Sequence, residues 1–402
     1  MSAHSSFVSL SCIRCRTEHP LNTQGRCTKC GGLLTSRYNV AAVDHLRGYG
    51  EGIWRYSVLL PPVSEENRVS LGEGATPCIR AKNIEPTGAS LLLKLEGANP
   101  TGSFKDRGAA LGISLAKDFG YSDVFTASSG NAAAAISAYA ARGGLGCTVL
   151  ARPDAGPSKL MQTASYGATV YMVKGLFSDA SGLLASLERA SCILGNAMNL
   201  FIWAPVNPLI LEGFKSIAYE LVQDAPEYVF VPTAGGDLAY ALYKGFEELA
   251  ELGAIRSIPR IVVVQGEGAD PTVRAIGHGD EMVEEIPDAS TVASALRVSF
   301  GAEHALIAAR KSGGFGVSVN DQAIVDAQKL LARKEGVFCE VSSAASVAAF
   351  IKCVNEGTID RGESVAALLT GSGFKEPPVL DAAFPLVEGV DKIRTNQPSK
   401  PC

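Results

Sequence analysis

Histidine and positive charge are both scarce in this sequence, and their scarcity excludes several kinds of protein. The chain has five histidines among 402 residues. None of them lies in the motifs described below, which argues against a serine–histidine–aspartate hydrolase and against a histidine-based metallohydrolase. Lysine and arginine number 36 against 41 aspartates and glutamates, which gives a formal net charge of −5. This balance provides no attraction for nucleic acid or for an anionic membrane.

Long apolar runs are missing too. No segment is both apolar and long enough to span a bilayer, so the 47% of hydrophobic residues indicates a buried α/β core. The first residues do not place an apolar stretch after a basic one, as a secretory signal does, and we expect a cytosolic (cytoplasmic) protein. A chain of this length has room for two domains and an appendage.

The ten cysteines do not follow the pattern of a disulfide framework. Six of them stand alone in apolar or terminal stretches, where reduced thiols are common: Cys78, Cys147, Cys192, Cys339, Cys353 and Cys402. The other four form two Cys-x-x-Cys pairs, Cys12 with Cys15 and Cys27 with Cys30. Two such pairs supply four thiolates to a structural zinc ion in a ribbon, which leaves no open position for catalysis. The alternative is a set of reduced thiols without a metal.

From residue 71 onward, short apolar segments alternate with amphipathic ones, which is typical of parallel β-sheets with helices on both faces. The expected strands lie at 124–126, 147–150, 169–173, 228–231, 261–264 and 366–369. The expected helices lie at 41–47, 131–142, 158–166, 213–222 and 321–334. The prediction is therefore an α/β fold that follows an N-terminal arm.

A lysine follows a strongly apolar run. Residues 99–108 read Asn-Pro-Thr-Gly-Ser-Phe-Lys-Asp-Arg-Gly and separate the run at 91–95 from a helical pattern. At such a strand-to-helix junction, the amine of Lys105 can be held in a partly dry pocket. Desolvation lowers the pKa of an amine, as a lysine needs in order to attack an aldehyde and form a Schiff base. Taken alone, the turn also fits a solvated lysine.

Three further segments follow strands and carry small or hydroxyl-bearing residues. At Ser128-Ser129-Gly130-Asn131, helix-terminal amides, hydroxyls and a carboxamide suit a carboxylate, although an ordinary helix cap gives the same pattern. The segment Thr233-Ala234-Gly235-Gly236-Asp237-Leu238 lets the backbone approach a phosphate group closely. Thr370 follows the last strand and offers a hydroxyl to a ring nitrogen. With Lys105 for an aldehyde, these groups match one cofactor, pyridoxal 5′-phosphate (PLP).

Further motifs accompany these segments along the chain. They are Gly52-Ile-Trp-Arg-Tyr56, Leu71-Gly-Glu-Gly-Ala-Thr-Pro77, Val206-Asn-Pro208, Glu212-Gly213, Thr291-Val-Ala-Ser-Ala295, Ser342-Ser-Ala-Ala345 and Thr370-Gly-Ser-Gly-Phe-Lys-Glu376. Through them the sequence resembles the threonine synthase family, which belongs to the fold-type II, tryptophan-synthase-β-like PLP-dependent enzymes. The resemblance extends from the cysteine pairs to about residue 380.

The resemblance implies a fold-type II architecture, with two three-layer α/β/α domains, parallel-rich sheets and an N-terminal four-cysteine ribbon. Residues 1–68 would form the arm that carries the ribbon. Residues 69–108 and 209–390 would form the large PLP-binding domain, and residues 109–208 the small domain. Residues 391–402 would be a disordered tail, and the family suggests a homodimer.

The resemblance also implies roles for individual residues. Lys105 would be the Schiff-base lysine and would then carry the substrate's α-proton. Asn131 would hydrogen-bond the 3′-oxygen of PLP, and Thr370, or less readily Ser372, would face the pyridine nitrogen. The substrate carboxylate would lie against Ser128, Ser129, Gly130 and Asn131. The PLP phosphate would lie against Ala234, Gly235, Gly236, Asp237 and Leu238.

Four departures from the family pattern concern phosphate ligands. Ala132 replaces a threonine, Ala204-Pro205 replaces Asn-Ser, and Ile210 replaces an arginine. Residues 234–238 replace a Gly-Asn-x-Gly-Asn loop. A charge-assisted hydrogen bond contributes about 1.5–3 kcal/mol, so the combined losses weaken a site for a phosphate-bearing substrate. The sequence therefore assigns substrate specificity to Ala132, Pro205 and Ile210.

We therefore expect a PLP-dependent carbon–oxygen lyase or synthase that acts on a substituted L-amino acid by elimination or β/γ-replacement, with a leaving group other than a phosphate ester. A genuine threonine synthase, which uses O-phosphohomoserine and water, is an alternative. A serine/threonine dehydratase-like ammonia-lyase is another. A non-catalytic relative would not need the Schiff-base lysine, and the acidic balance disfavours a zinc-ribbon nucleic-acid binder.

Overall fold

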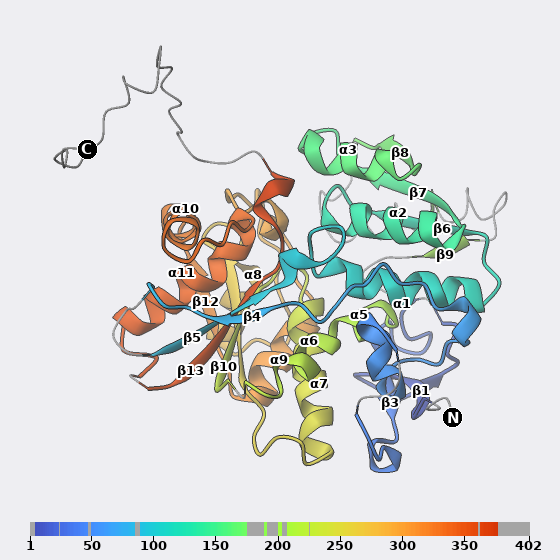
Figure 1. Ribbon diagram of the computed structural model, residues 1–402, viewed down its shortest axis with the longest axis horizontal. Coiled ribbons are helices and arrows are strands. Elements are labelled where there is room, and N and C mark those ends of the chain that lie inside the picture. Colours follow the sequence, from blue (N-terminus) through green and yellow to red (C-terminus); the bar gives the residue numbers. More distant parts are fainter. Residues whose placement is uncertain are drawn as a thin grey trace, which may run out of the picture.

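Three β-sheets organise the part of the chain that the structure describes (Figure 1). The structure is a computed structural model, and it describes residues 5–23, 25–46, 50–84, 89–174, 189–190, 200–202, 207–224, 226–360 and 362–376. Pro205 and the tail expected at 391–402 lie outside these residues. Among the described helices, none combines the length and the apolar composition that crossing a bilayer requires.

The N-terminal arm contains a small antiparallel sheet. Strand β1 (Phe7–Cys12) lies between β2 (Glu18–His19) and β3 (Leu34–Tyr38). The helix expected at 41–47 is instead a short 3-10 turn, η1 (Val40–Ala42), followed by a longer 3-10 segment, η2 (Gly52–Leu59). The backbone is already extended at Val43, directly after η1, so no α-helix continues there.

Buried polar contacts hold this arm against the rest of the protein. The hydroxyl of Tyr38 on β3 donates to the Glu212 carboxylate at 2.9 Å. The amine of Lys244 donates to the Ser36 carbonyl at 2.6 Å and pairs with the same Glu212 carboxylate at 2.5 Å. Because these groups are buried, each depends on its partner, and the arm is fixed in one orientation.

The largest sheet has six strands in the order β12-β11-β10-β13-β5-β4. Their bounds are β4 (Cys78–Arg80), β5 (Ser90–Leu95), β10 (Tyr228–Pro232), β11 (Arg260–Gly266), β12 (Gly316–Val319) and β13 (Ser364–Leu369). Of these described strands, only the edge strand β4 is antiparallel to its neighbour. Strand β10 is buried along its whole length, as in a parallel sheet covered by helices on both faces.

The second large sheet has four parallel strands in the order β8-β7-β6-β9. They are β6 (Asp123–Ala127), β7 (Gly146–Ala151), β8 (Thr169–Met172) and β9 (Leu200–Ile202). Figure 1 shows this sheet at the upper right and the six-stranded sheet at the left, with α1 and α5 between them and the arm. The expected strands lie within the observed ones, except that β8 ends at Met172 rather than at residue 173.

Helices cover both sheets. They are α1 (Lys105–Asp118), α2 (Asn131–Gly143), α3 (Pro157–Ser165), α5 (Ile210–Phe214), α6 (Ser216–Leu221), α7 (Asp237–Glu251), α8 (Pro271–His278), α9 (Glu303–Ser312), α10 (Asp321–Leu330) and α11 (Val341–Asn355). The helix expected at 213–222 is divided into α5 and α6. There Gly213 packs so closely on the Arg107 carbonyl that a Cβ would overlap with it.

A buried ion cluster fixes the start of α1. The guanidinium of Arg107, which is fully buried, donates to Glu96 at 2.8 Å and to Glu220 at 2.7 Å. Lys94 on β5 pairs with Glu220 at 2.6 Å. Charges buried in this way are stable only while they are partnered, so the cluster determines where the first turn of α1 lies. That turn carries Lys105.

Candidate functional site

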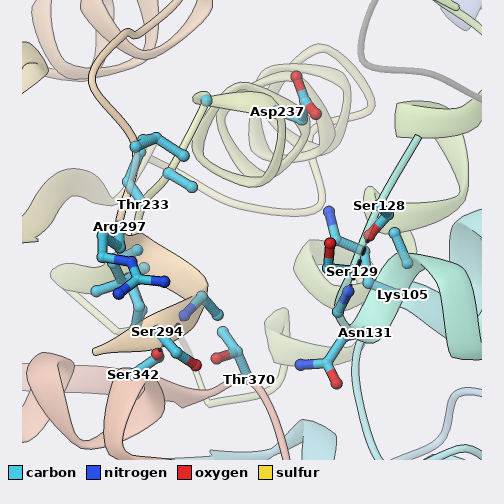
Figure 2. Close-up of a pocket in the computed structure, with 18 of the residues that line it drawn as sticks. Lys105, Ser128, Ser129, Asn131, Thr233, Asp237, Ser294, Arg297, Ser342 and Thr370 are labelled. Atoms are coloured by element: carbon cyan, nitrogen blue, oxygen red, sulfur yellow. Dashed lines mark hydrogen bonds between the residues drawn. The ribbon is translucent and has the colours of Figure 1, made fainter. Parts of the chain in front are cut away.

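A cavity of about 1070 Å³ lies between the two large sheets. Its wall includes turns that follow strands β6, β7, β10 and β13, together with the start of α1. The carboxyl ends of parallel strands are the usual place for ligands in open α/β sheets. Figure 2 shows Lys105, Ser128, Ser129 and Asn131 on one side of the cavity, and Thr233, Ser294, Arg297 and Ser342 on the other. All of the cofactor motifs expected from the sequence therefore meet in one place.

Lys105 is the first residue of α1 and points into the cavity between two aromatic rings. Its amine lies 4.4 Å from the ring centre of Phe104 and 4.9 Å from that of Phe214. Burial lowers the pKa of this amine, and the Asp237 carboxylate offsets part of that effect. A lysine in this environment is neutral more often than a solvated one, and a neutral amine is the form that attacks an aldehyde.

Backbone contacts hold the turn before Lys105 in position. The amide of Phe104 donates to the Thr370 carbonyl at 3.0 Å, and the amide of Ser372 donates to the Gly102 carbonyl at 2.9 Å. The Asp106 carboxylate accepts from the amide of Thr101 at 2.6 Å. Burial raises the pKa of Asp106 to about 7. The lysine turn and the turn after β13 thus form a single hydrogen-bonded unit.

The segment from Ser128 to Asn131 connects β6 to α2 and lines the cavity. No described side chain caps α2, so the ordinary helix cap considered for this segment is absent from the structure. Instead, the Ser128 hydroxyl accepts from the amide of Gly130 at 3.2 Å, and the Ser129 hydroxyl accepts from the amide of Arg152 at 2.7 Å. The amides at the start of α2 remain available to an anion in the cavity.

The segment Thr233–Leu238 connects β10 to α7 and lines the cavity with Thr233, Ala234, Gly235, Gly236, Asp237 and Leu238. Gly236 has a φ of 112°, a conformation that favours glycine, and no described side chain caps α7. A Cβ at Gly235 would meet no described atom within 4 Å, which shows that the backbone leaves open space there. The Asp237 carboxylate lies 3.8 Å from Nδ1 of the buried His304. The loop therefore offers amides to an anion from a helix start.

Thr370 lies at the end of β13 and lines the cavity. Its hydroxyl is 2.9 Å from the hydroxyl of Ser343, at the start of α11. Ser372, the other hydroxyl considered for a ring nitrogen, is not among the described lining residues, and its hydroxyl instead caps η7 (Gly373–Lys375). Of the two, Thr370 is the hydroxyl that a ligand in the cavity can reach.

Charged residues that the sequence did not single out also line the cavity. They include Arg26, Arg152, Asp154, Lys159, Asp288, Arg297 and Glu340, and the cavity is also lined by Lys375 and Glu376 from the motif that begins at Thr370. Lys159 on α3 pairs with Glu340 and with Glu376, each at 2.8 Å. Lys375 donates to the Thr101 carbonyl at 2.5 Å, and burial lowers the pKa of its amine to about 8. The only local signal for Glu340 is a charged residue inside the apolar run at 337–341.

These groups fit PLP. Lys105 has the lowered pKa that binding an aldehyde requires. The start of α7 presents uncapped amides beside the open space at Gly235, where a phosphate can lie. The oxygen Oδ1 of Asn131 is buried and has no hydrogen-bond partner among the described residues, as expected of a group that meets a ligand. The Thr370 hydroxyl remains for a ring nitrogen.

Comparison with known proteins decides the family. Residues 69–371 match the family described as pyridoxal-phosphate dependent enzyme. The threonine synthase of Methanocaldococcus jannaschii is 38% identical over 397 residues, which are 95% of this chain and 96% of that protein. The threonine synthase of Methanosarcina acetivorans is 36% identical over 92% of each chain. This chain belongs to the threonine synthase family of PLP-dependent enzymes.

Solved structures agree with this fold. Maize serine racemase has a TM-score of 0.62 and 23% identity, covering 74% of this chain and 88% of that one. Threonine deaminase isoform 2 from Solanum lycopersicum has a TM-score of 0.62 and 21% identity, covering 74% of this chain and 79% of that one. At these identities the likeness concerns the fold alone. The expected fold-type II architecture is confirmed, and PLP is the cofactor of the family.

One part of the cavity wall departs from the threonine synthase pattern. Ala132, on the first turn of α2, and Ile210, at the start of α5, both line the cavity. Leu211 and Phe214 line the cavity with them, so these four side chains offer it only apolar groups. Neither an alanine nor an isoleucine side chain can donate a hydrogen bond. We call this surface, formed by Ala132, Ile210, Leu211 and Phe214, the apolar wall.

The four cysteines of the arm form a second candidate site. Their sulfur atoms all lie within 4.8 Å of one another, with Cys12 and Cys30 at 3.4 Å and Cys15 and Cys27 at 3.6 Å. Zinc–sulfur bonds of about 2.3 Å in a tetrahedron place the sulfurs about 3.8 Å apart, so the arrangement is compatible with a structural zinc ion. Arg26 and Leu33, between and after these cysteines, also line the cavity.

Proposed function

We propose that this protein is a PLP-dependent carbon–oxygen lyase or replacement enzyme, acting on a substituted L-amino acid whose leaving group is not a phosphate ester. The observation that carries the proposal is the contrast within one cavity. Lys105, Asn131 and Thr370 line it as the cofactor chemistry requires, whereas Ala132 and Ile210 make the apolar wall where the family has phosphate ligands.

The residues of the site support a division of roles. Bound PLP supplies the electron sink that stabilises negative charge at the substrate's α-carbon. Lys105 holds the cofactor through its aldehyde, and its amine then takes the α-proton, which a lowered pKa favours. The amides and hydroxyls of 128–131 bind the substrate carboxylate. The amides at the start of α7 bind the cofactor phosphate, with Asp237 contributing its backbone N–H while its carboxylate faces His304.

Thr370 bears on the type of reaction. Its hydroxyl, unlike a carboxylate, does not force a pyridine nitrogen to hold a proton. A weaker electron sink favours elimination and replacement over transamination. Thr370 therefore supports an elimination or replacement reaction, in which Lys105 takes the α-proton.

The apolar wall affects which leaving group the substrate can carry. A single charge-assisted hydrogen bond contributes about 1.5–3 kcal/mol, which corresponds to about 10- to 100-fold in affinity. An isoleucine at position 210 forfeits that contribution. Two arginines elsewhere in the cavity are already near a carboxylate, since Arg152 forms an ion pair with Asp154 and Arg297 lies 3.7 Å from the same carboxylate. An uncharged or non-phosphate leaving group fits this wall better.

A genuine threonine synthase is the second candidate. The observation that favours it is the naming of the relatives, which are threonine synthases at 35–38% identity over most of their length. For that reaction, the substrate phosphate would need a cation of the cavity, such as Arg152 or Arg297. A serine/threonine dehydratase-like ammonia-lyase falls within the proposed class.

The homodimer, the cytosolic location and the domain borders at 68, 108 and 208 stay predictions of the sequence.

A spectroscopic screen tests the proposal. The holoenzyme is titrated with substituted L-amino acids while the visible absorbance of the bound cofactor is followed. We expect a saturable spectral change with a non-phosphorylated substrate, and a change with O-phospho-L-homoserine only at concentrations at least about tenfold higher. Saturation at the lowest concentrations by O-phospho-L-homoserine would favour the second candidate.

A further inference from the structure

Glu340 is a buried carboxylate at the edge of the cavity, and no role follows for it from the motifs. It precedes α11, and its side chain is 1% exposed. Its own amide donates to the Gly371 carbonyl at 2.9 Å, directly after Thr370. A Cβ at Gly371 would overlap with the Glu340 carboxylate, so the carboxylate is packed tightly under the turn that carries Thr370. A carboxylate in such a place needs partners to offset its desolvation.

One of those partners is the carboxamide of Asn131. The amide nitrogen Nδ2 donates to the Glu340 carboxylate at 2.8 Å. An ionised carboxylate only accepts hydrogen bonds, so it selects the NH2 end of the carboxamide. The oxygen and nitrogen ends of a carboxamide have nearly the same shape, so shape alone does not fix its orientation. Here the negative charge of Glu340 determines that the nitrogen end faces it. Figure 2 shows the Asn131 carboxamide turned toward Thr370.

The other partner is Lys159, which comes from the second sheet. Its amine pairs with Glu340 at 2.8 Å from α3, and it pairs with Glu376 at the same distance. Burial opposes the charge of Lys159, but the two carboxylates outweigh burial and raise the pKa of its amine. Glu340 therefore connects the α3 side of the cavity to Asn131 and to the Thr370 turn.

We propose that Glu340 is a positioning residue, which fixes the orientation of the Asn131 carboxamide at the cofactor, with Lys159 balancing its charge. The proposal rests on the proposed role of Asn131 opposite the 3′-oxygen of PLP. With Nδ2 held by Glu340, the carboxamide keeps a single orientation toward the cofactor. Without the negative charge, the carboxamide can rotate and its hydrogen bonding to the cofactor is no longer unique.

A double-mutant cycle tests this role. Glu340→Gln is made in the wild-type chain and in Asn131→Ala, and the dissociation constant for PLP is measured by titrating the apoproteins. We expect Glu340→Gln to raise that constant about tenfold in the wild-type background and by less than about twofold in Asn131→Ala. We also expect Glu340→Gln, in the presence of Asn131, to shift the absorption maximum of the bound cofactor.

The matched control is Glu248→Gln. Glu248 is also a buried carboxylate, pairs with Lys215 at 2.8 Å and accepts a hydrogen bond from Tyr219, but it is not among the described lining residues. Glu248→Gln should lower the free energy of unfolding, and it should leave the dissociation constant for PLP and the absorption spectrum of the bound cofactor unchanged. If Glu340→Gln does not fold, Lys159→Met provides the same cycle with the same expected pattern.

Two results would overturn the proposal. An equal change in the PLP constant in both backgrounds means that Glu340 acts independently of Asn131. If Glu340→Gln in the wild-type background changes neither the dissociation constant for PLP nor the absorption spectrum of the bound cofactor, Glu340 does not position Asn131. In either case the wild-type protein still binds PLP, so the proposed function stands. A wild-type chain that binds no PLP would instead overturn both.

Discussion

Two parts of the cavity wall, the one that binds the cofactor and the apolar wall, are built in different ways. Around the cofactor, backbone geometry places the groups: Lys105 begins α1, Gly236 precedes α7 with a φ of 112°, and Thr370 directly follows β13. The apolar wall, whose Phe214 lies beside Lys105, consists instead of side chains from α2 and α5, among them Ala132 and Ile210. One fold can thus keep its cofactor chemistry while its substrate changes.

The largest effect is expected from Lys105→Ala. Without the amine, the cofactor loses its covalent attachment and the α-proton loses its acceptor, so turnover should fall at least about 10³-fold. The visible absorbance of the bound cofactor should disappear as well. Lys311→Ala, an exposed lysine on α9, is the control and should behave like the wild type. Retained absorbance in Lys105→Ala would assign the cofactor to another lysine.

Alanine substitutions at two adjacent glycines test where the cofactor phosphate lies. An alanine at Gly235 enters open space beside the start of α7, so the apoprotein should keep its stability while PLP binds about tenfold more weakly. An alanine at Gly236 must adopt a positive φ, and its Cβ would lie 3.0 Å from the Cβ of Ala305. That variant should lose about 1–3 kcal/mol of stability even without PLP. Thermal unfolding and PLP titration of both apoproteins separate the two effects, and equal behaviour would contradict the phosphate position.

Ile210→Arg tests the apolar wall directly. A guanidinium at this position restores the charge typical of the family, and it should raise kcat/KM for O-phospho-L-homoserine about tenfold. Ile210→Met, which is similar in volume and uncharged, should leave that value unchanged. If the two variants have the same activity toward O-phospho-L-homoserine, the apolar wall does not exclude phosphate.

The cysteine ribbon contributes Arg26 and Leu33 to the cavity. We expect one zinc ion per chain by elemental analysis. Cys12→Ser should lose the metal, lower the Tm by at least about 3 °C, and raise the KM for substrate more than the PLP constant. Cys353→Ser, a buried single cysteine, is the control for metal content. A wild-type protein free of zinc would favour the reduced-thiol alternative.

The last prediction concerns pH. Burial lowers the pKa of Lys375 to about 8, against 10.5 for a free amine. Between these values the unfolded chain holds a proton that the folded protein has released, so stability rises with pH in this window. From pH 8 to pH 10, the apoprotein should gain about 1–3 kcal/mol relative to Lys375→Met, measured by urea unfolding. A parallel response of the two proteins would mean that this lysine titrates normally.

The cofactor segments were predictable because they are local. A strand followed by small residues and a helix is a pattern of adjacent residues, and residues 128–131, 233–238 and 370 were found in that way. The contacts that join Asn131, Lys159 and Glu340 were not predictable from the sequence. These three residues are far apart in the sequence and meet only because α3 and α11 approach the same cavity. The helix expected at 213–222 failed for a similar reason, since its division accompanies the close packing of Gly213 on α1.

The most direct test is the formation of threonine from O-phospho-L-homoserine by the wild-type holoenzyme. Threonine and phosphate are measured together, and kcat/KM is compared with that of the best non-phosphorylated amino acid from the spectroscopic screen. We predict a value for O-phospho-L-homoserine at least about 100-fold lower, because the apolar wall offers no charge to the phosphate. A kcat/KM of about 10⁴ M⁻¹s⁻¹ or more for O-phospho-L-homoserine, in the ordinary range of enzymes, would contradict the account.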